Sequence, residues 1–313
     1  MIIFIGLLGK SLGENKKKND ISDSKGTNRK RKLDGDNYII VHYKETVSYS
    51  DGFQGSCQSR SGVIREIEYN GNSYAPNEEI TINGDNSIKI SFSLSIATLV
   101  GFFSSQYDSN TRNIISIDFS HFDSSEVTNM HSLFRDCKQL EYINFSGCNT
   151  KKLADLSDMF YECIQLKSVD LSNFDTTLVT SLELMFCECS SLQSIDLSNF
   201  NTPLLQKTNS MFYKCSKLQS IILSNFKSSN ITSMDYMFKD CTSLKFLDIS
   251  SCDSDMTSSI SSIFNGVTSL EYLNIYNLES SSNLAVAIKS AFNSKDNLVV
   301  CQKNDIIIIA FVV

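Results

Sequence analysis

The sequence predicts an α/β repeat solenoid of about seven 26-residue units, each made of a short strand followed by a short helix. Internal repeats with a period of roughly 20–50 residues are the signature of solenoids. Three columns of residues carry the prediction when the chain is arranged in rows of 26. One column is leucine or isoleucine, at Ile114, Leu140, Leu166, Leu192, Leu218, Leu244 and Leu270. The second is phenylalanine, at Phe134, Phe160, Phe186, Phe212, Phe238 and Phe264. The third is cysteine, at Cys137, Cys163, Cys189, Cys215 and Cys241, with Val267 in the next row.

Each row has two halves with different periods. In "LKSVDLS", Val169 and Leu171 alternate with polar residues, which is the period of a strand with one buried face. In "SLELMFCECSSL" the apolar residues follow the spacing of one helical face, at Leu182, Met185, Phe186 and Cys189. A lone short strand and a helix well under about 12 residues are both marginal in water, so each row needs its neighbours.

The row is similar to the generic leucine-rich repeat, L-x-x-L-x-L-x-x-N/C-x-L. Leu166, Val169 and Leu171 match the first three positions, but the ninth is Phe174. The full ninth column is Phe122, Cys148, Phe174, Phe200, Phe226, Cys252 and Leu278. Because phenylalanine has no side-chain amide, we infer that stacked aromatic side chains fill this turn in place of an asparagine ladder.

The segments "MFYEC", "LDIS", "DLSNFDT", "VTSL" and "NITSMDYMF" resemble the BspA-like leucine-rich-repeat proteins. These are surface proteins of bacteria, mycoplasmas and mucosal protists. The resemblance extends from Ile114 to about Leu278, roughly half of the chain. It implies a cell-surface or secreted protein that adheres to host or matrix proteins.

Composition divides the chain into five parts. We interpret residues 1–9 as a truncated signal or anchor, 10–36 as a basic disordered linker, 37–110 as a β-rich N-terminal domain and cap, 111–300 as the solenoid, and 301–313 as an apolar C-terminal strand or the stump of an anchor. A signal peptide needs a basic start, which "MIIFIGLLG" lacks, so an apolar N-terminus of no consequence is the alternative for the first part. "IIIIAFVV" is too short for the roughly 20 residues that cross a bilayer.

The charge is distributed unevenly along the chain. Residues 10–36 contain nine Lys and Arg and five Asp and Glu, which gives this segment a net charge of +4. The whole chain carries −7, so the residues outside this segment carry −11. An acidic folded part disfavours nucleic acid as its ligand. The two basic clusters of the linker are reminiscent of a bipartite nuclear-localisation signal, although a solvated linker explains them as well.

Both ends of the array are expected to carry caps, because a solenoid otherwise exposes a core face. "YIIVHYKETVSY", "GVIREIEY", "EEITING" and "SIKISFS" predict a small domain of strands, with hairpin signals at two Asn-Gly pairs. The segments "LSIATLVGFF" and "NLAVAIKSAF" have helical spacing and predict helical caps, the first as a degenerate half-repeat.

Cysteine and histidine predict no catalytic site. We expect the five cysteines of the repeat column to pack in the core as small apolar side chains, because separations of 26 residues fit no zinc site. Cys57 and Cys301 lie outside the column and cannot be paired from sequence. A Cys137 and His131 nucleophile pair is conceivable, but core packing explains the cysteine. We therefore expect a protein that is not an enzyme and has no cofactor or metal.

The exposed side of the predicted strands is the candidate site for a partner. Acids, amides and aromatic residues alternate there with the buried positions, and seven strands at about 4.8 Å make a ladder of roughly 30 Å. The candidate partner-binding residues are Asp118, Tyr142, Asn144, Asp170, Asp196, Phe246, Asp248, Tyr272 and Asn274. Asn144-Phe-Ser and Asn230-Ile-Thr are glycosylation sequons, of which Asn230 on an outer turn is the better acceptor.

Three functional hypotheses follow. The first is a cell-surface or secreted protein, associated with the membrane through truncated termini, whose concave strand face binds a protein ligand of host or matrix origin. The second is an intracellular scaffold or adaptor, nuclear if the basic clusters act as a signal. An enzyme of unfamiliar type is the third. A shared fold does not identify a ligand.

Overall fold

The computed structural model describes residues 37–50, 63–84, 86–92, 96–226, 230–252, 259–278, 282–293 and 298–301, and the backbone of 306–309. The chain divides into two compact units, residues 1–33 and 34–313, and all described residues belong to the second. The predictions for residues 1–36 and for Cys57 lie outside the described residues.

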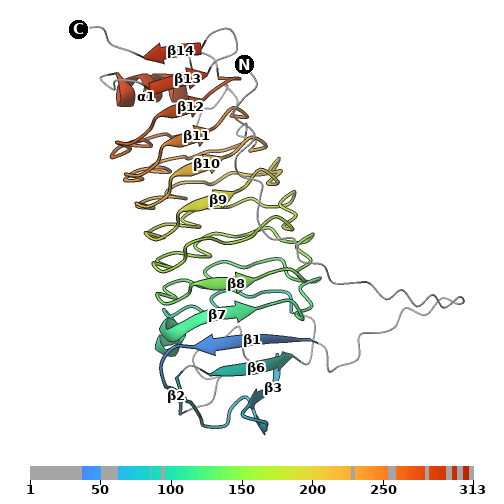
Figure 1. The fold of residues 1–313 in the computed structure, drawn as a ribbon. Coiled ribbons are helices and arrows are strands. Elements are labelled where there is room, and N and C mark those ends of the chain that lie inside the picture. Colours follow the sequence, from blue (N-terminus) through green and yellow to red (C-terminus); the bar gives the residue numbers. More distant parts are fainter. Residues whose placement is uncertain are drawn as a thin grey trace, which may run out of the picture. The chain divides into compact units, whose positions relative to one another are not determined.

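A β-rich region precedes the repeats (Figure 1). Its strands are β1 (Tyr38–Tyr43), β2 (Val47–Tyr49), β3 (Ile64–Tyr69), β4 (Asn72–Tyr74), β5 (Ile80–Ile82) and β6 (Ser87–Phe92). The predicted strands are therefore formed. β2 and β5 pair as a small antiparallel ribbon, and the others enter a six-stranded sheet in the order β4-β3-β6-β1-β7-β8.

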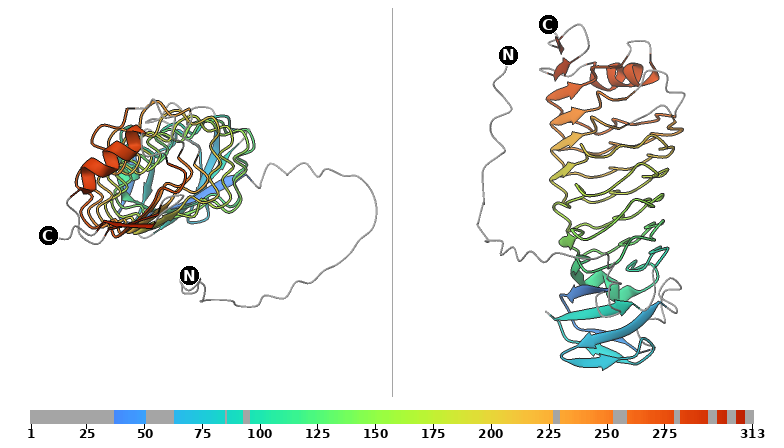
Figure 2. Two further views of the ribbon diagram at one scale, coloured as in Figure 1. Left: turned by 90° about the horizontal axis from the view of Figure 1, so that it is seen from above. Right: turned by 90° about the vertical axis from the view of Figure 1, so that its right-hand side faces the viewer.

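The repeats form a solenoid of short parallel strands. After a 3-10 helix, Ser109–Asn113, they are β7 (Ile114–Asp118), β8 (Tyr142–Asn144), β9 (Ser194–Asp196), β10 (Ser220–Ile222), β11 (Phe246–Asp248) and β12 (Tyr272–Asn274). Neighbouring strands pair in a 26-residue register, for example Ile221 with Leu247 and Leu247 with Leu273. Figure 2 shows these strands in a row along one side of the stacked coils, with the turns on the other side. The predicted repeat solenoid is thus confirmed.

The predicted helix of each unit is wrong, and a chain of tight turns takes its place. Leu182, Met185, Phe186 and Cys189 are all buried as expected. However, Leu184 and Glu188 have positive φ values of 57° and 61°, which an α-helix excludes. Alternate N–H groups bond to the next coil, as from Leu182 to Lys207 O, Leu184 to Asn209 O and Phe186 to Met211 O. Bonding between coils therefore replaces the i to i−4 bonds of a helix.

A second parallel ladder supports this turn-rich side. Single bridges join equivalent residues of successive coils, at Thr98, Asn129, Asp155, Ser181, Lys207, Ser233 and Ser259. The coils are consequently joined on two sides, and the apolar side chains lie between the two ladders.

The phenylalanine column forms a stack of rings through the core. Phe160, Phe186 and Phe212 follow one another with centroids 5.3 and 5.6 Å apart and interplanar angles of 12° and 2°. The stack continues in both directions from Phe103 to Phe264. Aromatic packing of this kind adds to the stabilisation from burial alone.

The cysteine column is in the core, as predicted, and it also makes hydrogen bonds. Cys189 is fully buried, and its thiol donates to the carbonyl oxygen of Phe160 in the preceding coil at 3.0 Å. The same bond, at 3.0–3.2 Å, links the other four column cysteines to a phenylalanine of the coil before. The nine cysteines of the described part of the chain, Cys301 included, form no disulfide.

The ninth column is buried, but the inference that aromatic side chains replace an asparagine ladder is wrong. An asparagine ladder is present one residue earlier, in a column that includes Asn173, Asn199, Asn225 and Asn277. Asn199 donates its amide to the carbonyl oxygens of Leu171 at 3.0 Å and Ser172 at 3.1 Å in the preceding coil. The amide at position eight satisfies the loop backbone, while the apolar residue at position nine fills the core.

Replacing Asn199 with alanine is expected to lower the free energy of unfolding by about 1–2 kcal/mol, because carbonyl groups of the preceding coil lose their donor. Chemical denaturation of the full chain measures it. Asn201→Ala is the matched control, since Asn201 is exposed and its side chain makes no hydrogen bond to any described residue. Equal stability of the two variants would contradict the role of the ladder.

Strands, rather than helices alone, close the two ends, so the prediction of helical caps is not supported. Residues 96–105 form turns that bond to the first coil, for instance from Gly101 N to His131 O, and make a half-coil without helix. β1 then pairs antiparallel with β7 and stops the parallel ladder.

At the C-terminal end of the array, α1 (Asn283–Phe292) is the expected helix, and Ser282 caps it. The sheet nevertheless continues beyond it through β13 (Leu298–Cys301) and the antiparallel β14 (Ile306–Ile309).

Candidate binding face

The structure places eight of the nine candidate residues on paired strands of the ladder. The register sets Asp118 beside Asn144, Phe246 beside Tyr272, and Asp248 beside Asn274. Asp196 ends β9 and lies beside Ile222 of β10. Asp170 is the exception, because residues 168–170 form no strand. We call this row of side chains the strand face; its role in binding stays a prediction.

The acids and amides of the strand face form the turns that end the strands. Asp170 and Asp196 accept the N–H of Ser172 and Ser198 through Oδ1, both at 2.9 Å. The same bond to the residue two positions on recurs at Asp118, Asn144, Asp248 and Asn274. This Asx turn is a recognised reason for Asp and Asn at such positions, and the repeated "D-x-S" is the sequence signal for it. Sequence reasoning treated these residues as surface and missed this role.

The turns also keep the carboxylates charged. Hydrogen bonds from Ser172 hold the pKa of Asp170 below its usual value, and hydrogen bonds from Ser198 do the same for Asp196. Burial and the charge of Asp170 oppose the lowering at Asp196 without cancelling it. The centre of the strand face therefore carries two ionised, exposed carboxylates on successive rows.

Aromatic side chains lie on either side of this acidic centre. Tyr142 is 61% exposed. Phe246 and Tyr272 are half-buried and stack with centroids 4.8 Å apart and an interplanar angle of 1°. Ile222 is exposed on the row before them. Aromatic side chains are enriched at surfaces that bind protein partners.

The strand ladder is interrupted between β8 and residues 168–170. No backbone hydrogen bond joins these two rows in the described residues, and the sheet that ends at β8 does not reach β9. Val169 is half-buried, whereas the equivalent Ile143 and Ile195 are buried. The interruption opens a cavity of about 330 Å³, which we call the slot. It is lined by Tyr142, Ile143, Asn144, Phe145, Ser146, Ser168, Val169, Asp170, Ser172 and Asn173.

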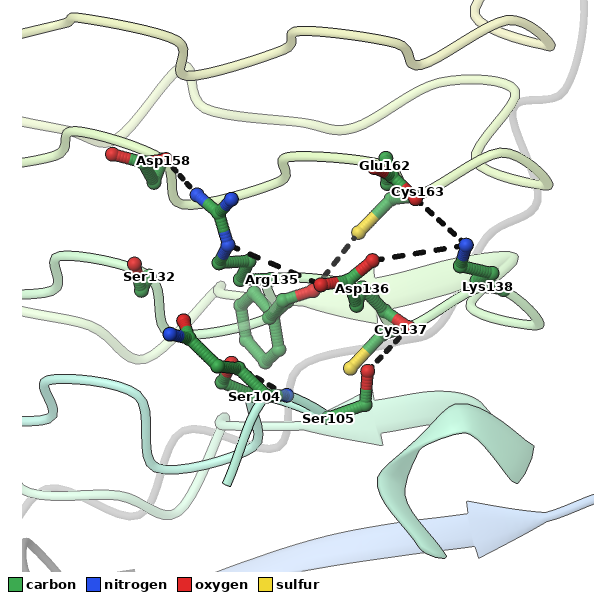
Figure 3. Close-up of polar contacts among 12 residues, drawn as sticks. Ser104, Ser105, Ser132, Arg135, Asp136, Cys137, Lys138, Asp158, Glu162 and Cys163 are labelled. Carbon is green, nitrogen blue, oxygen red and sulfur yellow. Dashed lines mark hydrogen bonds and ion pairs between the residues drawn. The ribbon is translucent and has the colours of Figure 1, made fainter. Parts of the chain in front are cut away.

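A cluster of charged side chains lies on the turn side near the start of the array (Figure 3). Arg135 forms an ion pair with Asp158 of the next coil, and its guanidinium lies 3.8 Å from the ring centroid of Tyr161. Lys138 bridges Asp136 at 3.8 Å and Glu162 at 2.7 Å. Burial raises the pKa of Asp158 against the lowering effect of Arg135. Each charge has an opposite partner within the cluster, so the cluster joins coils and leaves no open position for a ligand.

The conceivable Cys137 and His131 pair has separate partners in the structure. The thiol of Cys137 is fully buried and donates to Phe103 O at 3.0 Å. The two ring nitrogens of His131 lie within hydrogen-bonding distance of the hydroxyls of Ser157, at 2.8 Å, and Ser132, at 3.2 Å. The second histidine of the repeats, His121, stacks on Tyr38 with centroids 4.6 Å apart.

Both sequon asparagines use their side-chain amide. Asn144 is half-buried and donates to Asp118 Oδ1 at 2.9 Å. Asn230 is exposed and donates to Pro203 O at 2.8 Å. The greater exposure of Asn230 agrees with its choice as the better acceptor, and glycosylation itself stays a prediction.

The described residues contain no group of three or more His, Cys, Asp or Glu side chains that could hold a metal ion. None of their helices combines the length and the apolar character that crossing a bilayer requires.

The sequence matches the family described as "Mycoplasma protein of unknown function, DUF285" over residues 101–222 and 185–300. The two overlapping matches together span well over half of the chain. The protein belongs to this family. Comparison with curated proteins gave no match.

Two solved structures show some similarity to this chain. One is a leucine-rich-repeat protein of T. pallidum, TpLRR, at 18% identity, with 56% of this chain and 77% of that chain covered and a TM-score of 0.33. Another is TLR13 in a complex with ssRNA13, at 14% identity, with coverages of 67% and 39% and a TM-score of 0.21.

Proposed function

We propose that this protein is a non-enzymatic binding protein of the BspA-like leucine-rich-repeat type, displayed on the cell surface or secreted, which adheres to a host or matrix protein through the strand face. The observation that carries the proposal is the composition of that face. Two ionised carboxylates, Asp170 and Asp196, stand between an exposed tyrosine and the stacked pair of Phe246 and Tyr272. Paired strands present all of them except Asp170, whose Asx turn holds it between β8 and β9.

The face suits a protein surface that offers basic and apolar groups. From β9 to β12 its backbone is held by hydrogen bonds between neighbouring strands, so little ordering is needed there when a partner binds. Aromatic anchors supply contact area, and the carboxylates favour partners of positive potential. The acidic charge of the chain outside residues 10–36 argues against a nucleic-acid ligand for the folded part.

The test uses the purified full-length chain against a panel of immobilised extracellular-matrix and host plasma proteins, read by surface plasmon resonance. For a partner that binds, the double variant Phe246→Ser, Tyr272→Ser is expected to weaken the affinity at least about tenfold, as loss of aromatic anchors does. Tyr236→Ser is the matched control, because Tyr236 is 41% exposed in a turn segment away from the strands. An affinity that is unchanged in the double variant, or an equal loss of affinity in Tyr236→Ser, would contradict binding through the proposed face.

Location is tested separately with a small tag inserted in residues 10–36 of the full chain. Antibody labelling of intact, unpermeabilised cells, or a glycosidase-sensitive mobility shift lost in Asn230→Gln, is the expected result for a surface protein. Labelling only after permeabilisation, with no glycan, would instead favour the intracellular scaffold.

A further inference from the structure

Residues 168–170 pair as a strand with neither β8 nor β9, and the slot lies on their β8 side. From β9 to β13 each row hydrogen bonds to the next, and β7 is bonded to β8 in the same way. The bonds that cross the slot are instead made by side chains. The side-chain amide of Asn173 donates to Phe145 O at 2.8 Å, and Lys167 Nζ lies 3.7 Å from Glu141 Oε2. Among the described residues, the backbone N–H groups of Phe145 and Lys167 therefore have no hydrogen-bond partner across the slot.

The lining of the slot offers both donors and acceptors. Ile143, Phe145 and Val169 supply its apolar residues, and amides, hydroxyls and one carboxylate surround them. Within the described residues, no protein partner is found for the hydroxyls of Tyr142, Ser146 and Ser168. The carboxylate of Asp170 is an acceptor only, and its hydrogen bonds are to Ser172.

Size and charge restrict the ligand. A volume of about 330 Å³ is at the lower end of small-ligand pockets, roughly 300–1,000 Å³. It is too small for a folded peptide loop, and an ionised carboxylate at its edge disfavours anions such as phosphate or a carboxylated sugar. A single carboxylate with amides does not make a metal site among these residues. A largely apolar ligand would leave the polar lining without partners.

We propose that the slot binds one neutral pyranose ring of a glycan. Sugar hydroxyls both donate and accept, so they match a lining of unpaired backbone groups, amides and hydroxyls. Asp170 accepts from hydroxyl groups, and the exposed ring of Tyr142 covers the C–H face of the sugar. The inference rests on the proposed function in that the glycan is carried by the partner that the strand face meets.

The first experiment titrates the full-length, isotope-labelled chain with neutral monosaccharides, namely glucose, galactose, mannose, fucose and their N-acetylated amines. Amide shifts at Ile143, Phe145 and Val169 are the readout. At least one sugar is expected to bind with a Kd on the order of millimolar. Tyr142→Ala is expected to weaken it about tenfold, and Ser168→Trp to abolish it by filling the slot. Tyr276→Ala is the matched control, because Tyr276 is 45% exposed outside the slot.

Sialic acid and glucuronic acid test the role of charge and are expected to bind at least tenfold more weakly than the best neutral sugar. If the shifts saturate for no sugar, the slot holds water only and the proposal is overturned. If the shifts persist in Ser168→Trp, the sugar binds outside the slot and the proposal is overturned as well. A preference for the acidic sugars would overturn it as well.

A second experiment identifies the source of the glycan and tests the glycan inference independently of the proposed adhesion. The partner protein is compared before and after enzymatic deglycosylation, and with glycolipid vesicles and the free polysaccharide. If deglycosylation and Ser168→Trp leave protein binding intact while Phe246→Ser, Tyr272→Ser abolishes it, the glycan inference fails and the adhesion proposal stands. If sugars bind the slot but no protein binds the strand face, the glycan inference stands and the adhesion proposal fails.

Discussion

Alanine in place of Phe186 is expected to lower the free energy of unfolding by about 3–5 kcal/mol, which is the usual cost of removing a buried aromatic ring. Phe186 is fully buried near the middle of the array. It stacks on Phe160 and Phe212 in the coils on either side, so its loss opens a cavity that touches three coils. Coils in a solenoid depend on their nearest neighbours, and the effect therefore extends to the interfaces on both sides.

Denaturation in guanidinium chloride, followed by circular dichroism, measures this effect on the full chain. Leu178→Ala is the control, because Leu178 is 45% exposed and its truncation should cost less than about 0.5 kcal/mol. A broadened or two-step transition in Phe186→Ala would show the two halves of the array unfolding separately. A loss under about 1 kcal/mol would contradict the view that the ring stack is a main element of the core.

The period of the sequence was enough to predict the coils and the columns of the strand face. Once residues recur every 26 positions, equivalent positions must lie side by side in the stack, as Phe246 and Tyr272 do. The same columns did not reveal backbone conformation. An apolar stripe with spacings of three, four and seven is produced by the turns around Leu184 and Glu188 as well as by a helix. The stripe shows which side chains are buried and leaves the hydrogen bonding undetermined.

Two further features depend on detail that a column cannot show. The asparagine ladder was missed because the generic repeat places its amide at position nine, while here Asn199, at position eight, donates to the loop carbonyls of the preceding coil. The slot was missed because "KSVDLS" has the same pattern as "QSIDLS" in the paired row at β9. Among the side chains that face the core, the two segments differ at one position, where Val169 stands in the first and Ile195 in the second.

Stability is expected to fall steeply above about pH 9, because the buried thiols of the cysteine column resist ionisation, and four such thiols together contribute about 5.5 kcal/mol per pH unit. Burial is the largest cause that raises the pKa of Cys163, Cys189, Cys215 and Cys241. In the unfolded chain a thiol has a pKa of about 8.5. Below that value both states are protonated and the contribution is present in full. Above it the unfolded state loses protons that the folded state keeps, and each thiol removes about 1.4 kcal/mol per pH unit until its raised folded pKa is reached.

The slope of stability against pH, rather than stability itself, isolates this effect. Under a reducing agent, urea unfolding between about pH 7 and 10.5 should give Cys189→Ala a slope about 1.4 kcal/mol per pH unit shallower than that of the unaltered chain. Tyrosine and lysine groups titrate in the same range, but they are common to both proteins and cancel in the difference. Leu182→Ala, at another fully buried position, lowers stability without removing a proton and should keep the original slope. Identical slopes for Cys189→Ala and the unaltered chain would mean that the thiol ionises as readily in the fold as outside it, which is incompatible with a buried Sγ that donates its proton to Phe160 O.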